Sequence, residues 1–245
     1  MDFERPLVPG VLLGRRKRFF ADVRLDSGPE SGPERGAEVV AHCANTGRMS
    51  SAAEPGWRVW LLPADPVALA QGKRKLAWNL ELVEGQPGDV PLLVNTSRPN
   101  GLVAEAIAQG LVPELAGYSE QRAEVPYGEG RRVDLMLLGE GRRCLVEVKN
   151  VTLRLGPGRA AFPDAVSERA SAHLDALAAE VARGHRAVIF YLCRSDAETV
   201  EPAAGIDPAY AQAHQRAVQA GVEVLAYRCL ASPAGLRLGA RVAVL

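Results

Sequence analysis

The chain has 245 residues, of which 47% are hydrophobic and 24% charged, so it can form two domains with buried cores. Lysine plus arginine and aspartate plus glutamate number 29 each, so attraction to a polyanion must come from local basic clusters. This balance argues against a disordered chain and against a uniformly basic protein. Residues 1–10 lack the pattern of a signal peptide, and no stretch reaches the ~18 apolar residues of a membrane span. A cytoplasmic location is therefore expected.

The cysteines are far apart in the sequence and form neither a CxxC pair nor a Cys/His metal cluster. They are Cys43, Cys144, Cys193 and Cys229. We therefore expect reduced thiols with a structural role.

Short apolar runs, separated by basic or glycine-rich turns, dominate the first third of the chain. Strands are predicted at residues 7–14, 19–25, 37–43, 56–62 and 76–83. Residues 26–36 (DSGPESGPERG) predict a loop between the second and third strands. Four or five strands of this length favour a small barrel, with a domain boundary near residue 86.

Two basic clusters lie in turns of this predicted barrel and are candidate contacts for a nucleic-acid backbone. The clusters are Arg15, Arg16, Lys17 and Arg18, and Lys73, Arg74 and Lys75. Trp57, Trp60 and Trp78 are available for base stacking. The alternative is that the basic runs are solvated and that each tryptophan belongs to the core. Two clusters in one small barrel favour binding.

After residue 90 the pattern changes to helices and buried strands in alternation. Helices are predicted at 102–109, 165–182 and 210–220, and strands at 124–127, 132–138, 144–148, 187–193 and 222–227. This order predicts a mixed sheet covered by helices, and the whole chain is assigned to the α+β class with two domains.

A candidate catalytic cluster lies on two consecutive strands. Asp134 stands among leucines, where a carboxylate is costly unless it is paired, hydrogen-bonded or metal-bound. After a turn at 139–141, Glu147 and Lys149 are two apart and face one side of the next strand. A hairpin brings all three together, as metal-assisted phosphodiester hydrolysis requires. The carboxylates suit Mg²⁺ or Mn²⁺, and Lys149 suits the attacking water or the transition-state charge.

The alternative is an ordinary solvated ion pair, because an acid and a lysine two apart are common on strands. The apolar flanks Leu145, Val146 and Val148 favour a buried site instead. Glu124, at the start of the preceding strand, is a candidate third metal ligand.

The helix at 165–182 adds candidate phosphate contacts. With Ser167 as the predicted N-cap, Arg169 and His173 lie four apart on one face and can hold a scissile phosphate. An ordinary capped helix explains Asp164 and Glu168 equally well.

Several further motifs follow one another along nearly the whole chain. They are KRF at 17–19, ADV at 21–23, HCANTGRM at 42–49, KRK at 73–75, VNT at 94–96, EVKNVTL at 147–153 and FPDAV at 162–166. On these motifs the chain resembles SfsA, the sugar fermentation stimulation protein family of bacteria and archaea. Ala44 and Arg48 depart from the pattern expected in the third motif.

The resemblance implies an N-terminal OB-like barrel over residues 1–86 and a PD-(D/E)xK nuclease-like α/β domain over residues 87–245. It also implies DNA binding linked to regulation of sugar-utilisation genes of the maltose type. In the turn at 42–49, Asn45 and Thr46 are candidate DNA contacts, and a plain turn explains them equally well.

Two functions remain in competition at this point. The first is an Mg²⁺- or Mn²⁺-dependent deoxyribonuclease, and the second is a DNA-binding regulator that keeps the nuclease scaffold without turnover. A weaker third alternative is a carbohydrate- or nucleotide-binding module, since OB-like barrels also bind oligosaccharides. DNA strandedness stays open, and so does oligomeric state, with a homodimer as one alternative.

Overall fold

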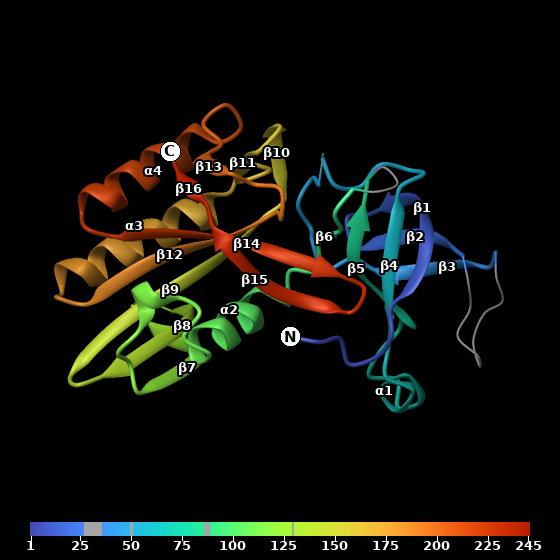
Figure 1. The fold of residues 1–245 in the computed structure, drawn as a ribbon, viewed down its shortest axis with the longest axis horizontal. Helices are drawn as coiled ribbons and strands as arrows, with labels where there is room; N and C mark the ends of the chain where they lie inside the picture. The colour runs from blue at the N-terminus through green and yellow to red at the C-terminus, as the bar shows by residue number, and fades with distance from the viewer. Residues whose placement is uncertain (27–35, 50, 86–88, 129) are drawn as a thin grey trace. The chain divides into compact units, whose positions relative to one another are not determined.

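The structure is a computed structural model that describes residues 1–26, 36–49, 51–85, 89–128 and 130–245. The chain forms two compact units, each containing helices and strands (Figure 1). The first comprises Met1–Ser97 and Cys229–Arg237, and the second comprises Arg98–Arg228 and Leu238–Leu245. The expected boundary near residue 86 and most of the expected loop at 26–36 lie outside the described residues.

The first unit contains a closed five-stranded barrel. Its strands are β1 (Val8–Arg16), β2 (Phe20–Leu25), β3 (Glu38–His42), β4 (Arg58–Pro63) and β5 (Trp78–Glu84). They pair in the order β3-β2-β1-β4-β5, and the additional β3–β5 pairing closes the circle. The predicted small barrel is therefore confirmed. The short elements α1 (Pro66–Ala70) and β6 (Leu92–Leu93) were not predicted.

The barrel core follows the alternation of its strands. In β2, Ala21, Val23 and Leu25 are buried, whereas the residues between them are exposed or half-buried. Successive side chains of a strand point to opposite faces, so this pattern places one side of the strand inside the barrel. Arg16 to Phe19, at the end of β1 and in the turn before β2, are exposed.

The second unit contains most of a mixed sheet with the order β15-β14-β12-β9-β8-β7, of which the end of β14 and the start of β15 fall within Cys229–Arg237 of the first unit. The strands are β7 (Glu120–Tyr127), β8 (Arg131–Gly139), β9 (Arg142–Val151), β12 (Arg186–Cys193), β14 (Glu223–Ser232) and β15 (Gly235–Arg241). β7, β8 and β9 are antiparallel, whereas β9, β12 and β14 run parallel. The predicted hairpin between Asp134 and Glu147 is therefore present.

Helices and a smaller sheet complete this unit (Figure 1). The helices are α2 (Pro99–Ala108), the single turn η1 (Pro113–Leu115), α3 (Glu168–Ala182) and α4 (Pro208–Gln219). The smaller sheet has the order β10-β11-β13-β16, with strands β10 (Leu153–Gly156), β11 (Arg159–Phe162), β13 (Thr199–Pro202) and β16 (Ala243–Val244). Its strands have at most four residues, too few to show a periodic pattern in the sequence. In the described part of the chain, no helix is long and apolar enough to cross a membrane.

Apolar faces of α3 and α4 cover one side of the main sheet. Leu174 and Leu177 of α3 share a core cluster with Met136 of β8 and Leu145 of β9. Met136 pairs with Leu145, and Leu135 with Val146. Because side chains alternate along a strand, Glu147 lies on the same side as Leu145, towards α3. Asp134 is one residue beyond the last position of β8 that pairs with β9, and its side chain contacts Asn100 of α2.

Candidate active site and nucleic-acid interface

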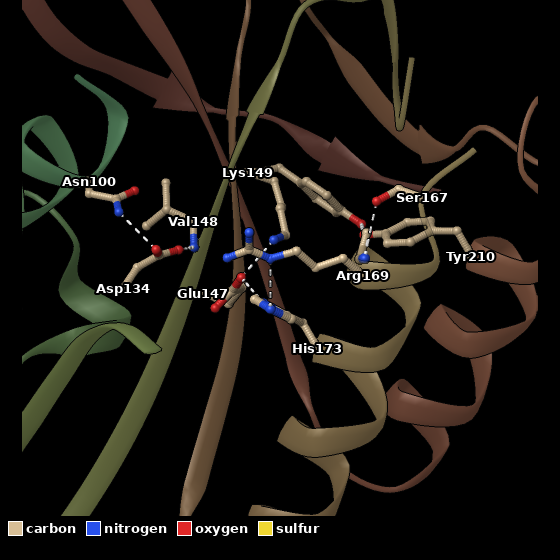
Figure 2. A network of polar contacts seen from close by, with 11 residues as sticks. Asn100, Asp134, Glu147, Val148, Lys149, Ser167, Arg169, His173 and Tyr210 are labelled. Carbon is tan, nitrogen blue, oxygen red and sulfur yellow. Dashed lines mark hydrogen bonds and ion pairs between the residues drawn. The ribbon is translucent and has the colours of Figure 1, made fainter. Parts of the chain in front are cut away.

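Asp134 is held by two hydrogen bonds at the end of the β8–β9 ladder. The last backbone pair of this ladder is Leu135 with Val146. Beyond this pair, the Val148 N–H donates to Asp134 Oδ2 at 2.7 Å, and Asn100 Nδ2 of α2 donates to Oδ1 at 2.8 Å (Figure 2). Burial and the nearby charge of Glu147 raise the pKa of Asp134, although these two hydrogen bonds and Lys149 oppose the rise.

Glu147 is almost fully buried and receives two polar partners on one oxygen. Lys149 Nζ lies 2.7 Å from Glu147 Oε1, and His173 Nδ1 contacts the same oxygen (Figure 2). Burial alone would raise the pKa of Glu147, but the hydrogen bond from His173 and the charge of Lys149 outweigh it and lower the pKa. Glu147 Oε2 is buried and has no hydrogen-bond partner within the described structure.

The predicted cap and the spacing of α3 are confirmed. Ser167 is the N-cap, and its hydroxyl accepts from the Ala170 N–H at 3.2 Å. Arg169 Nε lies 3.4 Å from His173 Nε2. If Arg169 donates to Nε2, then Nδ1 carries the proton that His173 donates to Glu147. The helix thus supplies a cation that is exposed and an imidazole that orients Glu147.

The position of α3 is supported by a buried acid that the sequence analysis did not single out. Asp207, with 1% of its surface exposed, caps α4 by accepting from the Tyr210 N–H at 2.9 Å. It also accepts from the Ser167 N–H at 2.8 Å. One carboxylate therefore joins the starts of two helices and holds the turn that presents Arg169.

Glu124 does not join the acidic pair. It lies in β7 opposite Asp134, but its backbone φ is +53° and its side chain is exposed. A left-handed residue breaks the regular alternation of a strand, so strand register no longer sets the side-chain direction. Among the described residues, no three His, Cys, Asp or Glu side chains group as a metal site. The expectation of Glu124 as a third ligand is therefore not supported by the structure.

Two further residues near the cluster were missed as site residues. Asn100 appeared in no motif with a chemical role, although it binds Asp134 directly. The Tyr127 hydroxyl is buried without a hydrogen-bond partner in the described structure. Burial, together with the charges of Glu147 and Asp134, raises the pKa of Tyr127 to about 12. Asn100 is among the residues on which the family resemblance rests, but the sequence assigned it no chemical role, because its contact joins segments that are distant in the chain.

In the barrel, the side chains of some candidate DNA contacts are hydrogen-bonded to other parts of the protein, whereas others are exposed and have no such bond in the described structure. Arg15 Nη2 donates to the carbonyls of Arg18 at 3.0 Å and Asn45 at 2.7 Å, and Nη1 donates to that of Arg48 at 3.2 Å. Arg15 is therefore a clamp between two turns. Asn45 is buried, and its Oδ1 accepts from the Gly47 N–H at 2.8 Å. Neither side chain is presented as a free phosphate contact, which corrects that expectation.

The other candidates differ in the same way. Lys17, Arg18, Thr46, Lys73 and Lys75 are exposed, and so is Arg74, whose guanidinium donates to Asn79 Oδ1 at 2.6 Å. Trp78 belongs to the barrel core, and Trp57 is half-buried against it. Trp60 is half-buried, with Arg58 over its ring at 5.7 Å. Trp78 and Trp57 are thus structural, as the alternative interpretation predicted, whereas Trp60 is half-buried and contacts Arg58.

A closed five-stranded barrel is joined in this chain to a mixed α/β unit that carries Asp134, Glu147 and Lys149, and this defines a two-domain class of protein. Known proteins share the two-domain arrangement. A family model described as the SfsA N-terminal OB domain matches residues 13–92, and one described as the Sugar fermentation stimulation protein RE domain matches residues 97–235. The chain belongs to the sugar fermentation stimulation protein (SfsA) family.

Individual relatives agree over the full length. The sugar fermentation stimulation protein homolog of Paramagnetospirillum magneticum is 49% identical, over 98% of this chain and 96% of the relative. The homolog of Geobacter sulfurreducens is 47% identical, over 100% of this chain and 99% of the relative. The structure of Pyrococcus furiosus SfsA in complex with Ca²⁺ has a TM-score of 0.86 at 24% identity, and covers 100% of this chain and 98% of that chain. At this identity the structural match shows the fold.

Proposed function

We propose that this protein is a DNA-binding, divalent-metal-dependent nuclease of the PD-(D/E)xK type. The observation that carries the proposal is the buried Oε2 of Glu147, which has no partner in the described structure although Asp134 lies beside it. A buried carboxylate oxygen without a donor or a cation is costly. Two neighbouring carboxylates, one with a raised pKa, form a site that a cation stabilises.

The donor set fits Mg²⁺ or Mn²⁺. Mg²⁺ is commonly held through one or two protein carboxylates, with waters and substrate phosphate oxygens as the other ligands. Asp134 and Glu147 would hold it, and the P. furiosus relative was solved with Ca²⁺, another cation that prefers oxygen ligands. A bound divalent ion supplies a more acidic water and charge for the phosphate.

The remaining side chains have separate tasks in hydrolysis. The Lys149 ammonium lies 2.7 Å from Glu147 Oε1 on a side chain that is 14% exposed, and beside a bound phosphate it would offset negative charge. His173 fixes Glu147, and the exposed Arg169 guanidinium can bind the scissile phosphate. The oxygen of water adds to phosphorus, one P–O ester bond breaks, and the leaving oxygen takes a proton.

DNA binding is proposed for the barrel. Lys17, Arg18, Lys73 and Lys75 are exposed cations in a chain with a formal net charge of zero. Local clusters of this kind attract phosphates even where the global charge does not. OB barrels commonly track a nucleic-acid strand in this way.

A non-catalytic DNA-binding regulator is the second candidate. Lys149 forms an ion pair with one oxygen of Glu147 and His173 contacts the same oxygen, so the cluster has a partial explanation as a structural ion pair. That explanation leaves the second oxygen of Glu147 without a partner. The nuclease proposal accounts for both oxygens and is preferred.

A cleavage time course tests the proposal. The purified protein is incubated with end-labelled single-stranded and duplex DNA in Mg²⁺, Mn²⁺ or EDTA. Cleavage is expected with metal only, is expected to disappear in Asp134→Asn, and is expected to fall about 10²- to 10³-fold in Lys149→Ala. Arg169→Ala should lower cleavage more than binding, whereas Arg216→Ala, an exposed arginine of α4 paired with Asp175, serves as the control. Absence of metal-dependent cleavage from the wild type would favour the regulator.

A further inference from the structure

We propose that Phe19 is a base-stacking platform, and that the barrel recognises single-stranded DNA through Phe19 and the cations around it. This inference rests on the proposed DNA binding and names its substrate class. It concerns a surface formed by Lys17, Arg18, Phe19, Thr46 and Arg48, here termed the hairpin tip.

Phe19 is the aromatic side chain that the barrel leaves in solvent. Half of its surface is exposed (50%), and every other Phe, Tyr and Trp in the chain, all of them among the described residues, is buried or half-buried. The exposed half of the residue contributes nothing to the core, because only buried apolar area stabilises the fold. A flat apolar face in solvent suits stacking on an unpaired base.

The backbone of the turn presents these side chains at a conformational cost. Lys17 and Arg18 have φ angles of +50° and +63°, a region that glycine and asparagine adopt more easily. Both are long cations with exposed side chains. Strained positions of this kind are enriched at functional sites, and here two consecutive ones carry the cations that directly precede Phe19.

Arg15 joins the two segments that form the hairpin tip, the β1–β2 turn and the loop that carries Thr46 and Arg48. Its guanidinium donates to the Arg18 carbonyl in the β1–β2 turn and to the Asn45 and Arg48 carbonyls in the following loop. The Cys43 N–H also donates to the Phe19 carbonyl at 2.7 Å. Thr46 and Arg48 are therefore held close to the turn that carries Phe19, so the surface is organised before any ligand binds.

The cations of the hairpin tip differ from the neighbouring Arg16 in that Arg16 is paired with an acid. Arg16 Nε and Nη2 bind the Asp22 carboxylate at 2.6 and 2.7 Å, so its charge is compensated. Within the described part of the chain, Lys17, Arg18 and Arg48 form no ion pair with an acid. Free cations around one exposed ring match a strand whose phosphates and unstacked bases are both accessible. In a duplex the bases are stacked on one another and offer no face to Phe19.

The test compares oligonucleotides that share their phosphates and differ in their bases. Full-length protein in EDTA, which prevents metal-dependent cleavage, is titrated with a fluorescent oligothymidylate, an abasic oligonucleotide of equal length, and a duplex. Phe19→Ala should bind oligothymidylate about 5- to 150-fold more weakly and leave abasic binding unchanged. Phe19→Tyr keeps the ring and should restore binding. Val67→Ala, which shortens an exposed side chain of the same unit, is the control.

Salt dependence tests the cations separately. Lys17→Ala and Arg18→Ala should each reduce the slope of log affinity against log salt by about 0.7 for the single strand, and Arg16→Ala by less. Equal loss of oligothymidylate and abasic binding in Phe19→Ala overturns the stacking role, and so does no loss at all. Tighter binding of the duplex than of oligothymidylate also overturns the stacking role of Phe19, but it leaves the proposal of DNA binding standing. A wild type that binds none of the three ligands refutes the DNA-binding proposal as well, whereas absence of cleavage in Mg²⁺ leaves this inference standing.

Discussion

Replacing Asp134 by asparagine is the most informative perturbation of the acidic pair, because it removes charge while keeping shape. In the metal-free protein both carboxylate oxygens of Asp134 accept from donors, Asn100 Nδ2 and the Val148 N–H. An asparagine amide would place its own donor against one of them, at a cost of about 1–3 kcal/mol. Loss of a buried negative charge beside Glu147 offsets this cost. The metal-free stability should therefore change by no more than about 2 kcal/mol.

The response to metal should change much more. A ligand at about 100 times its Kd stabilises the folded state by about 2.7 kcal/mol, which corresponds to a Tm increase of about 5 to 10 °C. If Asp134→Asn weakens Mg²⁺ binding about 100-fold, the same concentration is close to Kd and contributes about 0.4 kcal/mol. The expected Tm increase in the variant is then about 1 °C.

Differential scanning calorimetry with Mg²⁺, Mn²⁺ or EDTA provides the measurement. Glu147→Gln should lose the shift in the same way, whereas Asp175→Asn, the same substitution as Asp134→Asn but on the exposed face of α3, should keep it. Lys149→Ala should also keep most of the shift. A wild type with no metal-dependent shift, or an Asp134→Asn variant that retains it, would show that the two carboxylates do not hold a metal.

Two further predictions concern residues that act through contacts. Asn100→Ala removes the hydrogen bond to Asp134 Oδ1 and should weaken Mg²⁺ affinity about 10- to 100-fold in isothermal titration, with little change in DNA affinity in EDTA. If the variant binds Mg²⁺ as tightly as the wild type, Asn100 does not position Asp134. Burial lowers the pKa of His214, so the unfolded chain binds more protons than the folded one below pH ~6.5, and stability should fall as the pH is lowered through that range. His214→Phe keeps a ring beside Tyr191 and Tyr210 but cannot titrate, so urea unfolding at pH 7 and pH 5 should show a smaller loss than in the wild type.

Much of this protein could be predicted from local sequence patterns. Alternating and continuous apolar runs marked the five barrel strands, and they also marked β8, β9 and β12. Ser167 before an apolar stripe marked the start of α3, and the spacing of Glu147 and Lys149 fixed their common face. These features depend on backbone periodicity and on neighbours within a few residues, and both can be read from the sequence.

The tertiary structure alone decided how those side chains are used. Only chain folding shows that Asn100 holds Asp134, that His173 rather than Glu124 completes the acidic cluster, and that Arg15 is a clamp while Lys17 is exposed. Each outcome depends on a contact between residues far apart in the chain or on the burial of one particular side chain. The same sequence pattern is compatible with a guanidinium that binds a backbone carbonyl and with one that is exposed to water. Which of the two occurs is decided by how distant segments pack together.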